Sequence, residues 1–402
     1  MISNKTTPQR RKLLVLTSTF PRWEGDNEPP FVFELCRRLS ANFDVLVLAP
    51  HAPGAKTLET MSGLTVVRFR YFLEWGETLA YQGGILANLR SNRLRYLLVP
   101  LFILSQLTVL IRLVSREKPD VLHAHWLIPQ GLVAVAARLF SRHRPTLLCT
   151  AHGSDLYSLR GRLLSALKST VMLRSDKVTV VSGAMKSYAI SLGAEPDRVS
   201  VISMGVDMAD TFTPATPSVR RNNELLFVGK LTAQKGIESL VRAMPQIVKN
   251  HPETMLSIVG KGPDEEALRA LTEALEITKN VNFLGAIPNK KLPELYRRAT
   301  ALVFPSTTEE GFGLVCVEAM ACECPVIASD LPAMREILQD GETGLLFRPS
   351  DSGELAAKIL TLLADPVSRQ SMGRAARDFV SQRFDWKITA QRYDDMLNGL
   401  LT

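Results

Sequence analysis

The stretch Ser306-Thr-Thr-Glu-Glu-Gly-Phe-Gly-Leu-Val-Cys-Val-Glu-Ala-Met-Ala321 is the starting point for interpreting the whole chain. The apolar run Ala301–Phe304 just before it is typical of a buried strand, and the residues after Gly311-Phe-Gly313 are typical of a helix. A strand, a glycine turn and a helix N-terminus favour a bound anion, because free backbone N–H groups and the helix dipole point at one place. The stretch therefore predicts a phosphate-bearing ligand beside this turn.

Two carboxylates, Glu310 and Glu318, flank the turn. Eight helical steps of about 1.5 Å would separate them by roughly 12 Å. The two carboxyls of a glycoside hydrolase are closer, at about 5 to 9.5 Å. We therefore expect the two carboxylates to bind different parts of one long ligand, such as a nucleoside diphosphate that carries a sugar. The alternative, from spacing alone, is a helix whose glutamates face solvent.

The composition bounds the class of protein. A chain of 402 residues is long enough for two domains, and its 46% hydrophobic and 22% charged content is typical of a soluble globular enzyme. Five cysteines, an odd number, and a polar start without an apolar signal segment favour the reducing cytosol. Cys322 and Cys324 lack the further ligands of a structural zinc site, so we expect packing thiols and no metal.

Positive charge is concentrated in the first half of the chain. Residues 1–205 carry 26 lysines and arginines against 14 acidic residues, whereas residues 206–402 carry 22 against 26. This asymmetry predicts an anionic partner for the first half, such as a membrane surface or a lipid phosphate. We expect no nucleic acid, because neither a zinc-finger spacing nor an RNA-binding aromatic signature is present.

The most apolar segment is Tyr96–Ile111, which follows Arg90, Arg93 and Arg95. It is shorter than the roughly 20 residues that a membrane-spanning helix needs. We expect a buried crossover helix, and the alternative is a peripheral amphipathic contact with anionic lipid.

Apolar runs separated by helical stretches recur along the chain, which is the parallel α/β pattern. The strands expected in the first half are Lys12–Ser18, Val45–Ala49, Val121–Ala124, Thr146–Thr150, Val178–Val181 and Val199–Ile202. Those expected in the second half are Leu225–Val228, Met255–Val259, Val281–Leu284, Ala301–Phe304 and Val326–Ala328. The proline-containing residues 206–223 between the halves indicate a linker. We expect two Rossmann-like doubly wound domains that bind ligands at the carboxyl ends of their strands.

Two lysines follow a strand and a glycine in Phe227-Val-Gly-Lys-Leu-Thr-Ala-Gln-Lys-Gly-Ile237. Lys230 and Lys235, together with a helix N-terminus, would neutralise a diphosphate without a metal ion. The chain contains no D-x-D pair of the kind that holds a magnesium ion beside a nucleotide sugar. The sequence therefore predicts a metal-independent reaction, although the lysines alone are equally typical of a solvated surface.

Histidines end two strands of the first half. His152 follows the strand Thr146–Thr150, with Gly153 and Asp155 after it, and His123 and His125 share one face of an earlier strand. A histidine at a strand end donates or accepts hydrogen bonds in a ligand site. A structural loop histidine is an equally good interpretation at this point.

Taken together, these pieces resemble glycosyltransferase family 4, whose members are retaining enzymes of the GT-B fold. The resemblance covers nearly the whole chain and is densest in the second half. Its motifs are Gly229-Lys-Leu-x3-Lys235-Gly236, Gly260-Lys-Gly-Pro263, Phe283-Leu-Gly285, Pro305-Ser306, Glu310-Gly-Phe-Gly-Leu-x3-Glu318-Ala-Met-Ala321, Pro325-Val-Ile and Asp340-Gly-x-Thr-Gly344-Leu-Leu, with Thr150–Asp155 and Gly205-Val-Asp207 in the first half.

The resemblance implies an acceptor-binding domain at 1–205, the linker 206–223, a nucleotide-sugar-binding domain at 224–384 and a terminal helix at 385–402 that crosses back. Glu318 would bind the donor ribose, Glu310 the transferred sugar, and the lysines the diphosphate. The implied donor-binding residues are Gly229, Lys230, Lys235, Ile287, Glu310, Gly311, Phe312, Gly313, Leu314 and Glu318. The implied catalytic residues are His152, Lys235 and Glu310, and the implied acceptor-side residues are His125, His152 and Asp155.

The chain departs from the family pattern at three places. Lys230 stands where arginine is common, and Glu323 stands where a turn glycine is usual. The first loop, which is glycine-rich in the family, reads Gly25-Asp-Asn-Glu-Pro-Pro-Phe31 here, so contacts made by that loop in relatives do not transfer.

The function predicted from these features is a cytoplasmic, peripherally membrane-associated hexosyltransferase. It would move a sugar from a nucleotide sugar to a hydroxyl group of a lipid-linked or cell-envelope polysaccharide precursor, without a cofactor. The leaving diphosphate would act as the base on the same face of the sugar. Two alternatives stay open at this point: a nucleotide-sugar epimerase of the same architecture and a non-catalytic nucleotide-sugar-binding subunit.

Overall fold

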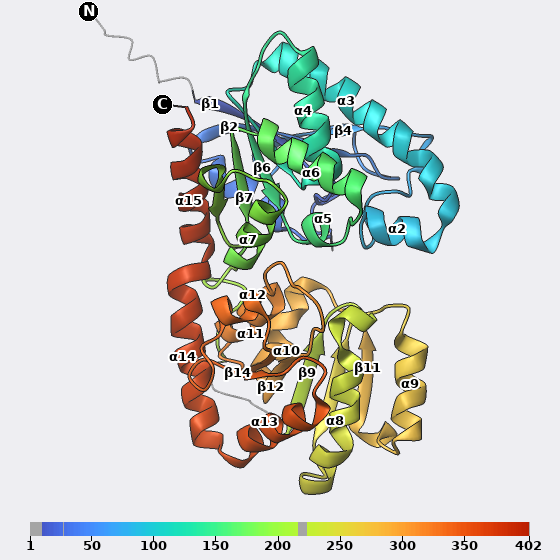
Figure 1. Cartoon of the computed structure of the whole chain (residues 1–402), viewed down its shortest axis with the longest axis vertical. Helices are drawn as coiled ribbons and strands as arrows, with labels where there is room; N and C mark the ends of the chain where they lie inside the picture. Colours follow the sequence, from blue (N-terminus) through green and yellow to red (C-terminus); the bar gives the residue numbers. More distant parts are fainter. Residues whose placement is uncertain (1–9, 27, 216–222, 402) are drawn as a thin grey trace, which may run out of the picture. The chain divides into compact units, whose positions relative to one another are not determined.

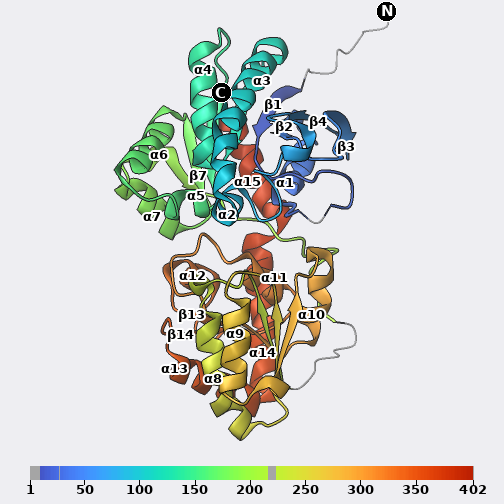
Figure 2. The same cartoon turned by 90° about the vertical axis from the view of Figure 1, so that its right-hand side faces the viewer.

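The computed structural model describes residues 10–26, 28–215 and 223–401 of the chain. Figure 1 and Figure 2 show that these residues form two compact units. Unit 1 consists of the described chain as far as Val181, Met185–Ile202 and the segment from Ala390 onward, and unit 2 consists of Ser182–Ala184 and Ser203–Thr389. Residues 216–222 of the expected linker lie outside the described residues.

Among the described residues, unit 1 is built on an eight-stranded sheet in the order β3-β4-β2-β1-β5-β6-β7-β8. All neighbouring strands are parallel except β3 and β4. The strands are β1 (Arg11–Leu16), β2 (Phe43–Pro50), β3 (Leu58–Met61), β4 (Leu64–Phe69), β5 (Val121–His125), β6 (Thr146–Ala151), β7 (Lys177–Val180) and β8 (Val199–Val201). The helices are α1 (Phe31–Leu39), α2 (Ile85–Ser91), α3 (Leu98–Glu117), α4 (Leu132–Phe140), α5 (Ser154–Tyr157), α6 (Arg162–Arg174) and α7 (Gly183–Ser191).

The described part of unit 2 contains a six-stranded sheet in the order β11-β10-β9-β12-β13-β14, with parallel neighbours throughout. Its strands are β9 (Glu224–Val228), β10 (Met255–Val259), β11 (Val281–Gly285), β12 (Ala301–Phe304), β13 (Val326–Ser329) and β14 (Leu345–Phe347). Its helices are α8 (Ile237–Asn250), α9 (Glu265–Ala274), α10 (Leu292–Arg298), α11 (Leu314–Ala321), α12 (Pro332–Ile337), α13 (Ser352–Ala364) and α14 (Pro366–Phe384), and α15 (Trp386–Gly399) has residues in both units.

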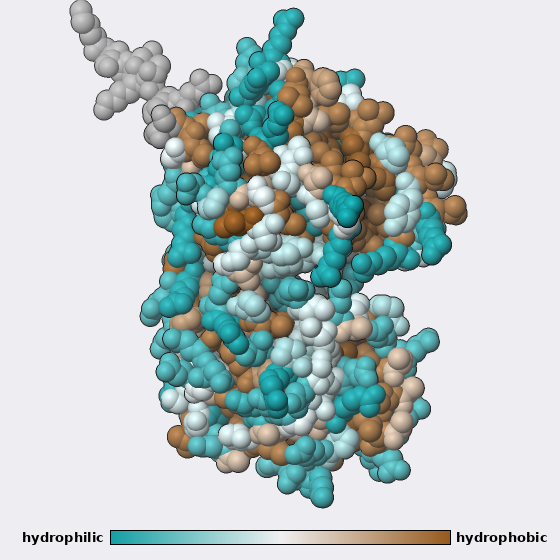
Figure 3. All heavy atoms as spheres, in the orientation of Figure 1, coloured by the Kyte–Doolittle hydropathy of each residue, from teal (hydrophilic) through white to brown (hydrophobic). Residues whose placement is uncertain are grey.

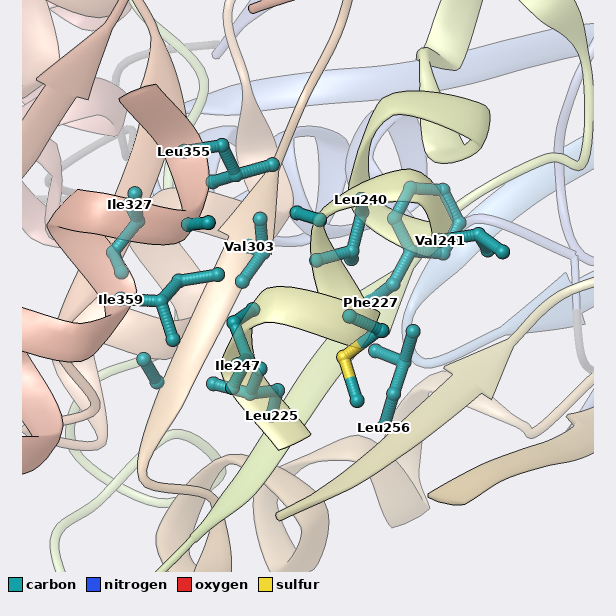
Figure 4. Packing of buried hydrophobic residues seen from close by; sticks show 14 of the residues in the cluster. Leu225, Phe227, Leu240, Val241, Ile247, Leu256, Val303, Ile327, Leu355 and Ile359 are labelled. Atoms are coloured by element: carbon teal, nitrogen blue, oxygen red, sulfur yellow. The ribbon is translucent and has the colours of Figure 1, made fainter. Parts of the chain in front are cut away.

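The central strands of unit 2 are buried along their whole length because helices cover both of their faces. All residues of β9 and β12 are buried, whereas the edge strand β11 alternates between buried and exposed positions. In unit 2, β9, β12 and β13 pack against α8 and α13 through a continuous apolar core, which Figure 4 shows around Phe227 and Val303. The doubly wound architecture expected from the sequence is therefore confirmed in each unit.

Three strands were missed because they are short or flank turns. They are β3 and β4, which extend the sheet of unit 1 beyond β2, and the three-residue β14 at the edge of unit 2. The first part of the expected linker also packs on unit 2: the guanidinium of Arg297 donates to the carbonyl oxygens of Thr211 and Thr213 at 3.2 and 2.7 Å.

The prediction for the apolar segment Tyr96–Ile111 was wrong in length and in burial. The helix α3 has 20 residues because it continues through Arg112 to Glu117. Together with the turn before it, it forms the stretch Arg93–Glu117, which is long and apolar enough to cross a membrane by length and composition, yet only 28% of its most apolar window is buried. The helix does cross from β4 to β5, as expected, but only one of its sides is buried.

Candidate active site

The site in unit 2 forms where its strand order reverses. The strand β9 lies between β10 and β12 in the sheet. From β9 the chain adds β10 and β11 on one side, and it then adds β12, β13 and β14 on the other side. Open α/β sheets bind ligands at such a switch point, outside the carboxyl ends of the strands. The loops that begin there are 229–236, after β9, and 305–313, after β12.

These two loops are held together by main-chain contacts. The amide of Thr307 donates to the carbonyl oxygen of Gln234 at 3.0 Å. Gly236 has φ +62°, and a Cβ atom at this position would lie 1.9 Å from the carbonyl oxygen of Pro305. Only glycine fits such a close approach of two backbones. The Lys235-Gly236 pair of the sequence therefore fixes the lysine beside the second loop.

Lys235 and Glu310 form an ion pair across the two loops. Their Nζ and Oε1 atoms are 2.6 Å apart, and the hydroxyl of Ser306 donates to the same carboxylate oxygen at 2.6 Å. The two side chains are 29% and 15% exposed, so the pair remains accessible to a ligand. The structure thus brings two of the three predicted catalytic residues together, with a cation beside a carboxylate that can accept hydrogen bonds.

Glu318 occupies a separate and buried position on α11. It is 3% exposed, Asn289 donates to its Oε1 atom at 3.0 Å, and the hydroxyl of Tyr296 donates to its Oε2 atom at 3.0 Å. Burial raises the pKa of Glu318 to about 7, although both hydrogen bonds oppose the shift. The group is a carboxylate held in place by two donors, with lone pairs left to accept further hydrogen bonds.

The interval between the two glutamates is only partly helical. The helix α11 begins at Leu314, and Gly313 before it has φ +102° with the methyl of Met334 where a Cβ would stand. The helical distance of roughly 12 Å used above therefore does not describe this interval. Glu310 and Glu318 nevertheless contact different residues, as expected for carboxylates that bind different parts of a ligand.

The remaining predicted donor residues line the same two loops and their neighbours. Lys230 is exposed, and its side chain forms no hydrogen bond or ion pair within the described part of the chain. Gly229 lies against the loop after β10, because a Cβ on Gly260 would meet the Gly229 carbonyl oxygen at 1.8 Å. Phe312 is buried, with its ring 5.2 Å from that of Phe384, so a ligand would meet its main chain.

The structure also places two further positions from the sequence analysis of the donor side, Ile287 and Glu323. Ile287 is half-buried and lies two residues before Asn289, which holds Glu318. Glu323 has φ +57°, in the left-handed region that a turn glycine adopts without strain. The family turn is therefore kept at Glu323 despite the missing glycine.

In unit 1 the strand order reverses at β1, which lies between β2 and β5. His125 ends β5, and His152 follows β6, the next strand in the sheet. The Nδ1 atom of His125 and the Nε2 atom of His152 are 2.9 Å apart, and the two rings are stacked with centroids 5.2 Å apart. Two of the predicted acceptor-side residues are therefore in direct contact.

This contact belongs to a longer column of rings. The ring of His123 lies 4.2 Å from that of His125 and 5.6 Å from that of Tyr393, which belongs to the part of α15 in unit 1. Burial lowers the pKa of His123 and His152 to about 3 and that of His125 well below its usual value. The three imidazoles are neutral near pH 7, so each acts as a hydrogen-bonding group without charge.

Asp155 fixes the turn that carries His152. Its buried carboxylate accepts backbone N–H groups of Leu127 at 2.7 Å, His152 at 3.1 Å and Gly153 at 3.2 Å. Burial raises its pKa even though these N–H groups stabilise the charged form. Asp155 therefore links the loop after β5 to the loop after β6 through hydrogen bonds from their backbones.

Several residues of these sites were missed because their signals are not local. Asn289, Tyr296 and Ser306 hold the two glutamates, and Tyr393 reaches the histidines from the end of the chain. Within the described ranges, no group of three or more histidine, cysteine, aspartate or glutamate side chains is arranged to hold a metal ion.

Comparison with known proteins covers both halves of the chain. Residues 30–210 match the family model described as Glycosyltransferase Family 4, and residues 210–379 match the model described as Glycosyl transferases group 1. A glycogen synthase of Mycobacterium tuberculosis is 32% identical over 278 residues, which are 68% of this chain and 67% of that protein.

Two further relatives extend the comparison. A GDP-mannose-dependent alpha-(1-6)-phosphatidylinositol monomannoside mannosyltransferase of Mycolicibacterium smegmatis is 29% identical over 290 residues, covering 67% of this chain and 74% of that protein. The crystal structure of HepE from Anabaena with UDP-glucose has a TM-score of 0.77 and 21% identity, and the match covers 96% and 99% of the two chains. From these matches, its two parallel sheets and the loops described above, the chain belongs to glycosyltransferase family 4 and has the GT-B fold.

Proposed function

We propose that this chain is a retaining glycosyltransferase that moves a hexose from a nucleotide-diphosphate sugar to a hydroxyl group of an acceptor. The observation that carries the proposal is the accessible pair of Lys235 and Glu310, 2.6 Å apart where two strand ends meet. A donor of this class has anionic oxygens beside sugar hydroxyls. A lysine next to a carboxylate complements both groups at once.

In the proposed reaction, the bond between the anomeric carbon and the diphosphate oxygen breaks, and a bond to the acceptor oxygen forms on the same face. The acceptor proton passes to the leaving diphosphate, which becomes its base. Lys235 stabilises the negative charge that grows on the diphosphate as the bond breaks. Glu310 and the main chain at Gly311–Leu314 hold the sugar in position.

The other predicted residues take supporting roles. Glu318, held by Asn289 and Tyr296, accepts the ribose hydroxyls of the donor. Lys230 is a second cation for the diphosphate, and the main chain near Ile287 meets the base. His152 is a neutral hydrogen-bonding group for the sugar or the acceptor, and His125 positions it through their 2.9 Å contact.

We also propose that the transfer needs no metal ion. The sequence lacks a D-x-D pair, and the lysines of the loop 229–236 supply positive charge in its place. The ammonium group of Lys235 pairs with Glu310 and is partly exposed, so a diphosphate oxygen would bind it beside this carboxylate.

For the acceptor, we propose a lipid-linked or polysaccharide precursor of the cell envelope. The relatives named above include a glycogen synthase and a phosphatidylinositol monomannoside mannosyltransferase, and one solved relative holds UDP-glucose. We place the reaction in the cytoplasm, at a membrane surface, because unit 1 carries the basic half of the sequence.

A panel of UDP-, GDP- and ADP-sugars, each with and without candidate acceptors and with a chelator, tests the proposal. The expected result is one donor whose sugar appears on an acceptor while the chelator has no effect. Conversion of a donor to another sugar without any acceptor would identify an epimerase instead. Tight donor binding without transfer to any acceptor would identify a binding subunit.

A further inference from the structure

The outer side of α3 is an exposed apolar surface on unit 1. The helix buries one stripe of side chains, Phe102, Gln106, Leu110 and Val114, which recur every four residues along one face. The opposite side and the turn before it, Arg93–Leu97, carry large apolar groups in solvent. They are Leu94 at 73%, Tyr96 at 57%, Leu97 at 73%, Leu101 at 41% and Leu104 at 62% exposed.

A neighbouring loop widens this surface. The hydroxyl of Ser105 on α3 donates to the carbonyl oxygen of Arg70 at 2.5 Å, and the ring of Tyr71 packs on that of Phe102 at 5.1 Å. The next residues, Phe72, Leu73 and Trp75, are 39%, 61% and 75% exposed. We call these three residues, with the five exposed residues of the preceding paragraph, the α3 surface.

Figure 3 shows apolar residues gathered over α3 in one broad area, at the upper right of the view. Scattered single apolar residues are normal on any protein surface, whereas a contiguous patch marks a place of contact. The α3 surface therefore needs an occupant, and its charge indicates which one.

The charge along the α3 segment is positive throughout, and in the neighbouring loop the exposed Glu74 between Leu73 and Trp75 pairs with Arg70 at 3.4 Å. From Ile85 to Arg116 the sequence contains five arginines and no aspartate or glutamate. Arg90, Arg93 and Arg112 are exposed, and none of them forms an ion pair with another described residue. Exposed apolar side chains with unpaired arginines beside them complement a surface that is apolar inside and anionic outside.

We propose that the α3 surface docks on a membrane of anionic phospholipids. The leucines and Trp75 enter the boundary between headgroups and acyl chains, and the arginines bind the lipid phosphates. The helix lies on the membrane and does not cross it, because its buried stripe already packs inside unit 1. A second copy of the chain is a poor occupant, since a two-fold contact would bring arginines against arginines.

This inference rests on the proposed function in one respect: it names the surface that would hold the enzyme beside a lipid-linked acceptor. Its test does not involve sugar transfer, so the two ideas fail separately. The full chain is mixed with vesicles of phosphatidylcholine and with vesicles in which part of the lipid is phosphatidylglycerol, and the bound fraction is measured by co-sedimentation. We expect binding to the anionic vesicles, a blue shift of the tryptophan emission as the exposed Trp75 enters the lipid, and release by salt.

Matched variants locate the contact. Leu97→Glu should weaken vesicle binding more than about tenfold, because an exposed leucine no longer enters the lipid. Arg93→Glu should weaken it by at least about fivefold, the effect of one surface arginine near anionic lipid. The controls are Leu163→Glu and Arg162→Glu on α6, since Leu163 is as exposed as Leu97 at 73%. Both controls should bind like the unmodified chain.

Equal binding to neutral and anionic vesicles would overturn the proposal, as would equal losses in the α3 and α6 variants. Retention in membranes after alkaline carbonate extraction would show a spanning helix instead. A concentration-dependent dimer in sedimentation experiments that Leu97→Glu dissociates would show that a second copy covers the surface. Circular dichroism of each variant confirms that a lost interaction reflects the surface and not the fold.

Discussion

The candidate sites of the two units are built on opposite electrostatic principles. In unit 2, Lys235 and Glu310 are charged, paired and partly exposed on two loops. In unit 1, His125 and His152 are stacked and their pKa values are lowered by burial, so they are neutral near pH 7. The charged loops suit a ligand that carries charge, whereas the neutral rings suit hydroxyl groups. This contrast supports a diphosphate donor on unit 2 and a hydroxyl acceptor on unit 1.

Removal of a charged group from the site of unit 2 should lower the turnover more than any substitution in the site of unit 1. Lys235→Ala and Glu310→Gln should each lower kcat by about 10²- to 10³-fold, because each removes a preorganised partner of the reacting groups. The measurement is steady-state transfer with the donor identified in the panel. Lys249→Ala and Glu253→Gln, exposed residues of the same unit, are the matched controls and should keep normal turnover. Near-normal turnover of both site variants would remove the pair from the mechanism.

Glu318 offers a pH test of the donor side. Its pKa is raised to about 7, and ribose hydroxyls donate to the charged form, so a bound donor lowers that pKa. Donor affinity should therefore be full above about pH 7 and fall by up to about tenfold per pH unit below it. Calorimetric titration with a nucleotide sugar at several pH values measures this dependence. Glu318→Gln should bind weakly with a flat profile; an equal slope in this variant would assign the dependence to another group.

Tyr393→Phe tests the uncharged column of unit 1. The substitution keeps the ring beside His123 but removes the hydroxyl that lies 3.4 Å from the Oγ1 atoms of Thr150 and Thr179. We expect a loss of about 0.5 to 1.5 kcal/mol in the free energy of unfolding. We also expect a change of kcat well below that of Lys235→Ala, with KM for the donor unchanged. Chemical denaturation and initial rates give both numbers, and a rise of the donor KM would contradict the assignment of the donor to unit 2 alone.

Glu323→Gly should have the smallest effect. A residue other than glycine at φ +57° carries backbone strain. Because glycine adds entropy to the unfolded chain, we expect a net stabilisation of no more than about 1 kcal/mol. Thermal unfolding measures it, and a clear destabilisation would mean that contacts of the Glu323 side chain outweigh the strain.

In unit 2 the sequence indicated the loops of the candidate site more clearly than the residues that hold its carboxylates, for a physical reason. Glycines such as Gly236 and Gly313 mark places where backbones approach closely, and that signal is local. The residues that hold Glu318, Asn289 and Tyr296, lie 29 and 22 positions away along the chain. Their pairing with Glu318 follows from strand order, which a single sequence does not specify residue by residue.

The contact between Tyr393 and His123 and the exposure of α3 are two other features that could not be predicted from the sequence. Tyr393 joins His123 from a terminal helix, so no spacing rule connects them. For α3, a long apolar run predicts burial because most such runs form cores. The structure instead leaves Leu94 and Leu97 largely exposed. Composition identified an unusual segment, and only the burial pattern shows which side of it is available to a partner.

The most direct test of the central claim is the anomeric configuration of the product. Proton NMR of the transferred sugar, made with the identified donor in the presence of a chelator, reports this configuration from the anomeric coupling. Same-face transfer by the diphosphate, with Lys235 in place of a metal ion, predicts a product with the configuration of the donor. An inverted product, or transfer that stops when the metal is removed, would contradict the account.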